Sequence, residues 1–246
     1  MDSIQDKVEK TLASLPPILI PNSIPIKSLN SSSSSSPPVL LVRPRIFTSQ
    51  DNQKLNELIT LINLAYTDAY WFKKPIFYDR MNMDRLLSSS YLKNESGFFI
   101  IITKEKEEGK GKGKENENDD KQVQSIVDNS NQESPNYLIA SAYVSLNIKE
   151  SSATLSLLSV HPEWQGKGLA KTLFQLIETH ILKNTFQIQY SRLEVVSVQT
   201  HLFQIYEKFG YQKVNQQLQW KDIGIDPDSC ISVPCHLEIL QKELLK

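Results

Sequence analysis

Apolar residues follow two periods along the chain, and these periods predict alternating strands and helices. Runs that alternate or are rich in β-branched residues predict strands at residues 39–42, 98–103, 137–148, 153–160, 192–198, 211–220 and 235–240. Apolar residues at helical spacing predict helices at residues 51–66, 80–88, 169–181 and 201–209. Strands dominate the first half and helices cross over in the second. We therefore expect an α/β fold (α+β mixed sheet) of about six to seven strands with helices on both faces.

Two segments interrupt these periods. Residues 1–38 contain Val8 and Leu12, which suit one face of a short helix, and then a serine run at 31–36 flanked by prolines. Such a segment buries too little apolar surface to offset its ordering entropy. Residues 104–135 are rich in Lys, Glu, Gly, Asn and Asp. We expect a disordered arm at 1–38 and one domain at 39–246, with a low-complexity insertion at 104–135 that joins two strands of one hairpin.

Charge and cysteine content narrow the classes of partner. The formal net charge is −1, so no global field favours nucleic acid or an anionic membrane surface. No leader pattern begins the sequence, and no apolar run approaches the ~20 residues of a spanning helix. Cys230 and Cys235 are expected to be reduced thiols, because only His236 stands near them and a metal site needs more ligands. We expect no metal and a cytoplasmic location, with the nucleus as an alternative. The sequence leaves the oligomeric state open.

One stretch, residues 155–181, predicts a phosphate-binding turn. Pro162 should end the apolar strand before it, and Gly166 and Gly168 allow a sharp turn into a helix. The first N–H groups of that helix and its dipole favour phosphate oxygens, and Lys167 and Lys171 add positive charge. The nucleotide P-loop spacing is missing, and the dinucleotide fingerprint lacks its third glycine.

Three motifs in order resemble the GNAT family of N-acetyltransferases. Residues 165–170 read Gln-Gly-Lys-Gly-Leu-Ala, which is similar to the family's pyrophosphate signature. Residues 158–162 read Leu-Ser-Val-His-Pro, similar to the apolar strand that precedes the signature in the family. Residues 205–211 read Ile-Tyr-Glu-Lys-Phe-Gly-Tyr, similar to the family's Tyr-Glu-Lys-x-Gly-Phe box. Within the family, the order and spacing are most like the bacterial type that acetylates the N-terminal alanine of a ribosomal protein.

The resemblance implies that the chain binds acetyl-CoA. It implies that the strand at 153–160 splays from the strand at 192–198, so that the N–H groups of Leu158 and Val160 face the coenzyme. Gln199 stands where the family commonly has asparagine, although a longer amide can donate similarly. The candidate coenzyme-binding residues are Leu158, Ser159, Val160, Gln165, Gly166, Lys167, Gly168, Leu169, Ala170, Lys171 and Gln199.

Two residues are candidates for moving protons. By the resemblance, Tyr206 would donate a proton to the leaving thiolate, and the alternative is a tyrosine that only packs on the apolar face of its helix. Glu194 stands where the ribosomal-protein enzyme has its base. Its apolar strand neighbours predict burial, which would raise its pKa, and the alternative is a solvent-facing strand residue.

The resemblance therefore predicts an acetyl-CoA-dependent N-acetyltransferase (an acyltransferase) acting on a primary amine in a ternary complex. The acceptor stays open among a protein N-terminus, a lysine and a small amine. The aromatic-rich stretch at 66–78 and the loop at 221–234 would shape that choice. A second hypothesis is a catalytically weak GNAT-fold module that binds acyl-CoA or serves as a scaffold.

Overall fold

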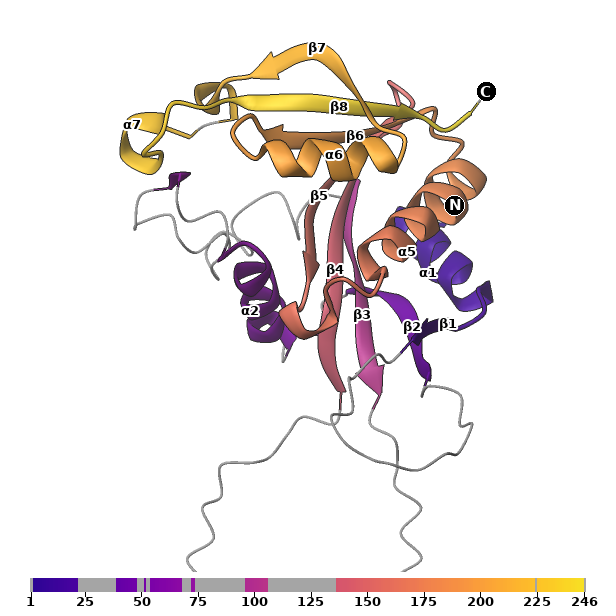
Figure 1. Cartoon of the computed structure of the whole chain (residues 1–246). Coiled ribbons are helices and arrows are strands. Elements are labelled where there is room, and N and C mark those ends of the chain that lie inside the picture. Colours follow the sequence, from indigo (N-terminus) through magenta and orange to yellow (C-terminus); the bar gives the residue numbers. More distant parts are fainter. Residues whose placement is uncertain are drawn as a thin grey trace, which may run out of the picture.

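The computed structural model of the chain describes residues 2–21, 39–47, 51, 54–67, 72–73, 96–105, 136–223 and 225–245 (Figure 1). The predicted helix at 80–88 lies outside the described residues, as do most of the insertion and most of the aromatic-rich stretch.

A single mixed sheet organises the described chain. Its strand order is β1-β2-β3-β4-β5-β6-β8-β7. The strands are β1 Ile18–Pro21, β2 Val39–Phe47, β3 Gly97–Glu105, β4 Asn136–Asn147, β5 Ser152–Val160, β6 Tyr190–Val196, β7 Gln212–Leu218 and β8 Leu237–Glu243. All described neighbours pair antiparallel except β5 and β6, which are parallel. The predicted mixed sheet is confirmed, and β1 is an extra strand within the segment predicted as an arm.

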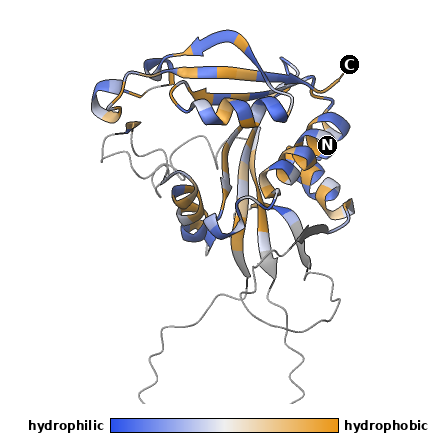
Figure 2. Ribbon diagram, viewed as in Figure 1, coloured by the Kyte–Doolittle hydropathy of each residue, from blue (hydrophilic) through white to orange (hydrophobic). Residues whose placement is uncertain are grey.

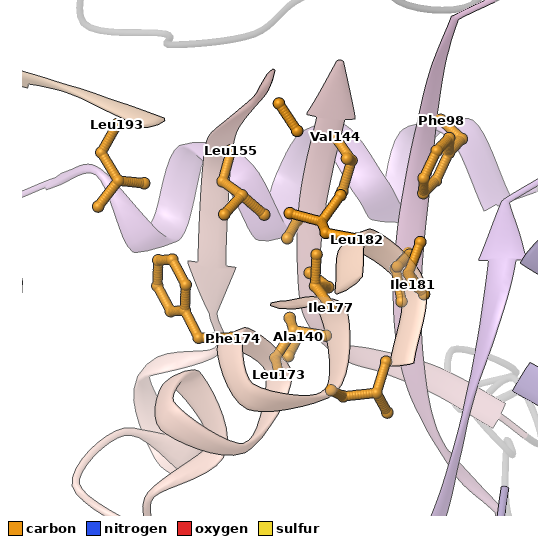
Figure 3. Close-up of a cluster of buried hydrophobic side chains, with 14 of the residues drawn as sticks. Phe98, Ala140, Val144, Leu155, Leu173, Phe174, Ile177, Ile181, Leu182 and Leu193 are labelled. Carbon is orange, nitrogen blue, oxygen red and sulfur yellow. The ribbon is translucent and has the colours of Figure 1, made fainter. Parts of the chain in front are cut away.

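Helices cover both faces of this sheet, as predicted. On one face, α2 (Leu55–Ala65) packs Leu58 and Ile62 onto a cluster from β3, β4 and β5. On the other face lie α1 (Ile4–Ser14), α5 (Leu169–Leu176) and η5 (Ile177–Thr185), a π-helical continuation of α5. Figure 3 shows the apolar side chains of α5 and η5 meeting those of the central strands. The sheet is therefore the middle layer of three, which buries its central strands on both faces.

The helix α1 corrects the prediction of a disordered arm. Val8 and Leu12 are buried in the main core cluster. The Thr11 and Thr185 hydroxyls lie 2.8 Å apart, which ties α1 to the end of η5. A capping box between Ser3 and Asp6 begins the helix. The prediction is wrong for this helix, because its apolar face has a partner surface. Residues 22–38 lie outside the described residues, so that part stays a prediction.

The strands β3 and β4 form the hairpin that was expected on either side of the insertion. Their register runs from Gly97 opposite Ser145 to Glu105 opposite Asn136. The connection between them therefore leaves and re-enters the sheet at the end where Glu105 and Asn136 face each other.

The C-terminal part of the chain completes the sheet in an order that chain position does not predict. After α6 (Thr200–Lys208), the chain runs through β7, η6 (Trp220–Ile223) and α7 (Pro227–Cys230), and β8 then inserts between β6 and β7. The outermost strand β7 is mostly exposed and hydrophilic (Figure 2). An edge with such side chains disfavours pairing with another chain.

Candidate active site

The parallel strands β5 and β6 pair over only part of their length. Their register runs from Ser152 opposite Tyr190 to Leu155 opposite Leu193. Beyond that point β5 continues to Val160 and β6 continues to Val196, but the two strands no longer pair with each other. Figure 1 shows the two strands diverging, with β6 turned across the start of β5. The edge of β5 at residues 156–160 is therefore open toward β6, as the resemblance implied.

A bulge in β5 lies at the start of this open edge. The register with β4 shifts between Ser141 and Tyr143, and Leu157 has a left-handed φ of 50°. The buried Ser159 hydroxyl donates a hydrogen bond to the Leu157 carbonyl oxygen at 3.1 Å. Ser159 thus braces the bulge from within. A bulge re-aims the backbone of the strand that carries it, so it sets where the nearby N–H groups point.

The chain turns into α5 directly after β5. The strand ends before Pro162, as predicted, and Pro162–Trp164 form the short helix η4. Gly166 and Gly168 have left-handed φ values of 72° and 82°, and Gly168 is the N-cap of α5. A Cβ on either glycine would meet no protein atom within 4 Å. The turn therefore needs glycine for its backbone conformation, and the space in front of it is open.

The N-terminus of α5 presents backbone donors to that space. The first intrahelical bond is from the Thr172 N–H to the Gly168 carbonyl oxygen, at 3.0 Å. The N–H groups at 169–171 precede it, and no side chain caps the helix. The side-chain amide of Gln165 donates a hydrogen bond to the Val160 carbonyl oxygen at 3.1 Å, which connects the turn to the end of β5. Donors and positive dipole meet at one place, which suits an anion.

A cavity of about 1010 Å³ joins the open edge of β5 to this turn. Among the predicted coenzyme-binding residues, those that line it are Leu158, Val160, Gln165, Gly166, Gly168, Leu169, Ala170, Lys171 and Gln199. Both proton-transfer candidates, Tyr206 and Glu194, also line it. The structure thus brings residues from β5, the turn, β6 and α6 to one space.

Two predicted residues lie beside the cavity without lining it. Ser159 is fully buried and bonded to Leu157. The Lys167 ammonium lies 4.4 Å from the centroid of the Trp164 ring, a cation–π geometry. Lys167 does not line the cavity, whereas its buried neighbour Trp164 does. Lys171 is thus the basic residue of the turn that lines the cavity.

Tyr206 points from α6 into an aromatic cluster at the cavity. Its ring packs edge-on against Phe174, Phe209 and Tyr211, with centroids 5.9, 6.4 and 6.3 Å away. Its hydroxyl makes no hydrogen bond to a side chain or backbone group of the described residues. Burial of the hydroxyl, with a smaller contribution from Tyr66, raises the pKa of Tyr206 above its usual range. The phenol therefore stays protonated at neutral pH and can donate.

Of the two alternatives for Glu194, burial is wrong and the solvent-facing position is the one that the structure shows. The neighbours Leu193 and Val195 are buried, but Glu194 itself is exposed on the opposite face of β6. In a strand, successive side chains alternate between faces, so apolar neighbours in sequence do not cover the residue between them. The Glu194 carboxylate lies at the cavity with access to water.

Sequence reasoning missed a buried polar network behind the cavity. The Tyr211 hydroxyl donates to the Glu178 carboxylate at 2.6 Å and lies 2.6 Å from the Ser191 hydroxyl. The Lys242 ammonium donates to the other Glu178 oxygen. This network joins η5, β6 and β8, and Tyr211 links it to the aromatic cluster. One signal was available: Glu178 interrupts an apolar helical run, where an unpaired charge would be costly.

Two further findings concern other kinds of site. Within the described part of the chain, no three His, Cys, Asp or Glu side chains are grouped so that they could hold a metal ion. The described helices include none with the length and apolar character that crossing a membrane requires.

Comparison with known families agrees with this geometry. The family described as "Acetyltransferase (GNAT) domain" matches residues 101–225, just over half of the 246 residues. The chain belongs to the GNAT family. The matched residues run from β3 to the loop after η6, so they include the open strand, the turn and α6.

Solved structures share the GNAT fold with this chain. A spermidine N-acetyltransferase from Vibrio cholerae, solved with CoA and spermine, is 15% identical with a TM-score of 0.50, covering 82% of this chain and 95% of that one. An acetyltransferase from Streptococcus agalactiae 2603 is 16% identical with a TM-score of 0.50, covering 82% and 98%. The ribosomal-protein-S18-alanine N-acetyltransferase from Escherichia coli is 12% identical with a TM-score of 0.49, covering 83% and 95%. A search of curated protein sequences found no significant match. At these identities the likeness concerns the fold and does not distinguish between acceptors.

Proposed function

We propose that this protein is an acetyl-CoA-dependent N-acetyltransferase that passes the acetyl group to a primary amine within a ternary complex. One observation carries the proposal: the open edge of β5 leads directly to a glycine turn whose helix presents unsatisfied N–H groups. An extended chain ending in a pyrophosphate would satisfy both sets of donors. The acceptor is a protein N-terminus, a lysine or a small amine.

The hydrogen-bond donors around the cavity support acetyl-CoA as the donor substrate. The N–H groups at 169–171 and the Lys171 ammonium would hold the pyrophosphate. The N–H groups of Leu158 and Val160 would bond the pantetheine arm, as a strand bonds its neighbour. The Gln199 side chain, 7% exposed and at the cavity, would add an amide contact. Acetyl-CoA supplies a thioester whose carbonyl carbon is open to attack by an amine.

Backbone N–H groups of β5 would stabilise the negative charge that develops on the carbonyl oxygen. They are held by the hairpin with β4 and by the Leu157 bulge, so they are oriented before the substrate arrives. Preorganised donors of this kind contribute a large share of many enzymes' rate enhancement.

Glu194 and Tyr206 would handle the two protons. An ammonium must lose a proton before its nitrogen can attack, and the exposed Glu194 carboxylate would accept it directly or through water. The Tyr206 hydroxyl would hold the proton that the departing sulfur needs. Its raised pKa keeps it in the donating form, and it has no hydrogen-bond partner among the described residues to compete for that proton.

Two measurements on the full chain test this function. Calorimetric titration with acetyl-CoA should give saturable binding at sub-millimolar concentrations, and mass spectrometry of a mixed amine and peptide library should reveal acetylated products. Binding without any acetylated product would favour the binding or scaffold module instead. Absence of binding would contradict both readings.

A further inference from the structure

Part of the cavity wall lies away from the turn and is built by two chain segments that meet. Phe72 and Lys73 come from the first, and Trp220, Ile223, Ile225 and Ile231 come from the second. The Ser232 N–H donates to the Phe72 carbonyl oxygen at 2.9 Å, and Lys73 forms a β-bridge with Ile231. In Figure 1, α2 and α7 lie on one side of the splayed strands and α5 on the other. We call the side chains Tyr66, Phe72, Trp220, Ile223, Ile225 and Ile231 the acceptor wall, all of which line the cavity.

Apart from the Tyr66 hydroxyl and the Trp220 ring N–H, the side chains of the acceptor wall are apolar. Phe72 is 2% exposed and Trp220 is 6% exposed. The Trp220 ring N–H donates to the Cys235 carbonyl oxygen at 2.6 Å. That bond satisfies the one polar atom of the ring, so the indole offers the cavity apolar surface alone. An apolar group of the acceptor would displace water from this wall favourably.

Few of the described residues that line the cavity carry a charge. Among the described residues that line it, Glu194 supplies the carboxylate, and Lys73 and Lys171 supply ammonium groups. The Lys73 ammonium lies 5.9 Å from the Phe72 ring centroid, at the acceptor wall. An acceptor with a second ammonium group would bring it against apolar side chains and a like charge. Beside Lys73, such a group would lose hydration and meet a charge of its own sign.

We propose that the acceptor is a primary monoamine with a bulky apolar body, and that polyamines are excluded. The proposal rests on the proposed N-acetyltransferase function and names its substrate class. Glu194 receives the single ammonium, and the apolar body lies on the acceptor wall. An aryl-alkylamine and a peptide N-terminus with an apolar first side chain offer the same chemistry from two sources, so both belong in the test.

The test compares acceptors with the full chain and saturating acetyl-CoA. The acceptors are 2-phenylethylamine, the dipeptide amide Phe-Gly-NH₂, propylamine and spermidine, with products identified by mass spectrometry. We expect kcat/KM for at least one of the two aromatic amines to exceed that for spermidine by about tenfold or more. Which of the two is faster identifies the source. If spermidine is acetylated as fast as both aromatic amines, the proposed acceptor class is wrong but the N-acetyltransferase function stands. If no amine is acetylated, the acceptor class and the N-acetyltransferase function are both wrong.

A pair of variants sharpens the test at the wall itself. Ile223 is 41% exposed, so Ile223→Glu should fold, and it places a carboxylate on the acceptor wall. Ile148→Glu is the control, because Ile148 is 53% exposed in the turn after β4 and does not line the cavity. Ile223→Glu should lower kcat/KM for the preferred aromatic amine and raise it for spermidine, each by about fivefold. Acetyl-CoA affinity should stay unchanged in both variants. Identical acceptor profiles for the two variants would contradict the proposal.

Discussion

The motif at residues 205–211 contributes one tyrosine to the cavity wall and another to the packed core behind it, and the hydroxyl groups of the two differ in their hydrogen bonding. The two tyrosines are Tyr206 and Tyr211, and their ring centroids are 6.3 Å apart. The Tyr211 hydroxyl is bonded to Glu178 and Ser191 inside the core. The Tyr206 hydroxyl lies at the cavity without a hydrogen bond to the described residues. Burial raises the pKa of both phenols, yet their surroundings give them different tasks.

The contrast extends to the backbone. Gly168 and Gly210 both adopt a left-handed conformation at a helix end. A Cβ at Gly168 would meet nothing within 4 Å, whereas one at Gly210 would contact the Lys242 side chain at 3.4 Å. On the cavity side, the Tyr206 hydroxyl has no hydrogen bond to the described residues and the space before Gly168 is open. Behind the cavity, Tyr211 is hydrogen-bonded to Glu178 and Ser191, and Glu178 also to Lys242. Substitutions of residues that line the cavity should therefore change turnover or acetyl-CoA affinity, and matched substitutions in the core behind it should change the free energy of unfolding.

The largest effect is expected from Tyr206→Phe. This change removes the hydroxyl and keeps the ring contacts with Phe174 and Phe209. If the hydroxyl donates the proton, kcat should fall by about 10²-fold or more, with acetyl-CoA affinity nearly unchanged. Steady-state kinetics and calorimetry measure the two quantities. Unchanged turnover would remove the proposed role of Tyr206.

Tyr211→Phe should show the opposite pattern. It leaves the Glu178 carboxylate and the Ser191 hydroxyl without their shared partner, so the free energy of unfolding should fall by about 1 to 3 kcal/mol. At a temperature where the variant is folded, kcat should stay within about twofold of the wild type. Chemical denaturation gives the first value. A loss of turnover equal to that of Tyr206→Phe would erase the contrast between wall and core.

The two glycines offer a matched pair at smaller scale. Alanine at either position carries the strain of a left-handed backbone, about 1 to 2 kcal/mol. Gly168→Ala also places a methyl group in the open space before the turn, so acetyl-CoA should bind roughly tenfold more weakly. Gly210→Ala should lower the free energy of unfolding by a similar amount and leave the affinity for acetyl-CoA unchanged. Equal affinities in both variants would argue against a ligand at the turn.

The smallest effect expected is in the pH profile. The pKa of Tyr206 is raised, so its phenol stays protonated above the usual tyrosine value of about 10. Turnover should therefore show no decline between pH 7 and about 10, because loss of the donor proton begins only at higher pH. A profile of kcat against pH in the wild type checks this. A falling limb below pH 10 that disappears in Tyr206→Phe would contradict the shifted donor.

Local signals in the sequence predicted where β5 ends, where the glycine turn lies and where α5 begins. Pro162 and the left-handed glycines act on the backbone at their own positions, so the end of β5 and the start of α5 could be predicted without knowing what surrounds them. The hairpin across the insertion could be predicted for the same reason, since its two strands are both strongly apolar.

Features that depend on distant partners were not predictable from the sequence. Val8 and Leu12 suit a helix, but only the surface of η5, far along the chain, makes that helix part of the core. The position of Glu194 needed knowledge of which face of β6 is covered. The insertion of β8 between β6 and β7, and the pairing of Glu178 with Tyr211, likewise join residues that no local pattern connects.

Hydrogen exchange of the backbone amides, with and without acetyl-CoA, tests the seat of the coenzyme most directly. Residues 152–155 of β5 pair with β6 in the free protein, whereas residues 156–160 do not. Acetyl-CoA should slow exchange at 156–160 and at 166–171 by about tenfold or more, and leave 152–155 unchanged. Binding that protects neither the open edge of β5 nor the turn would contradict the account.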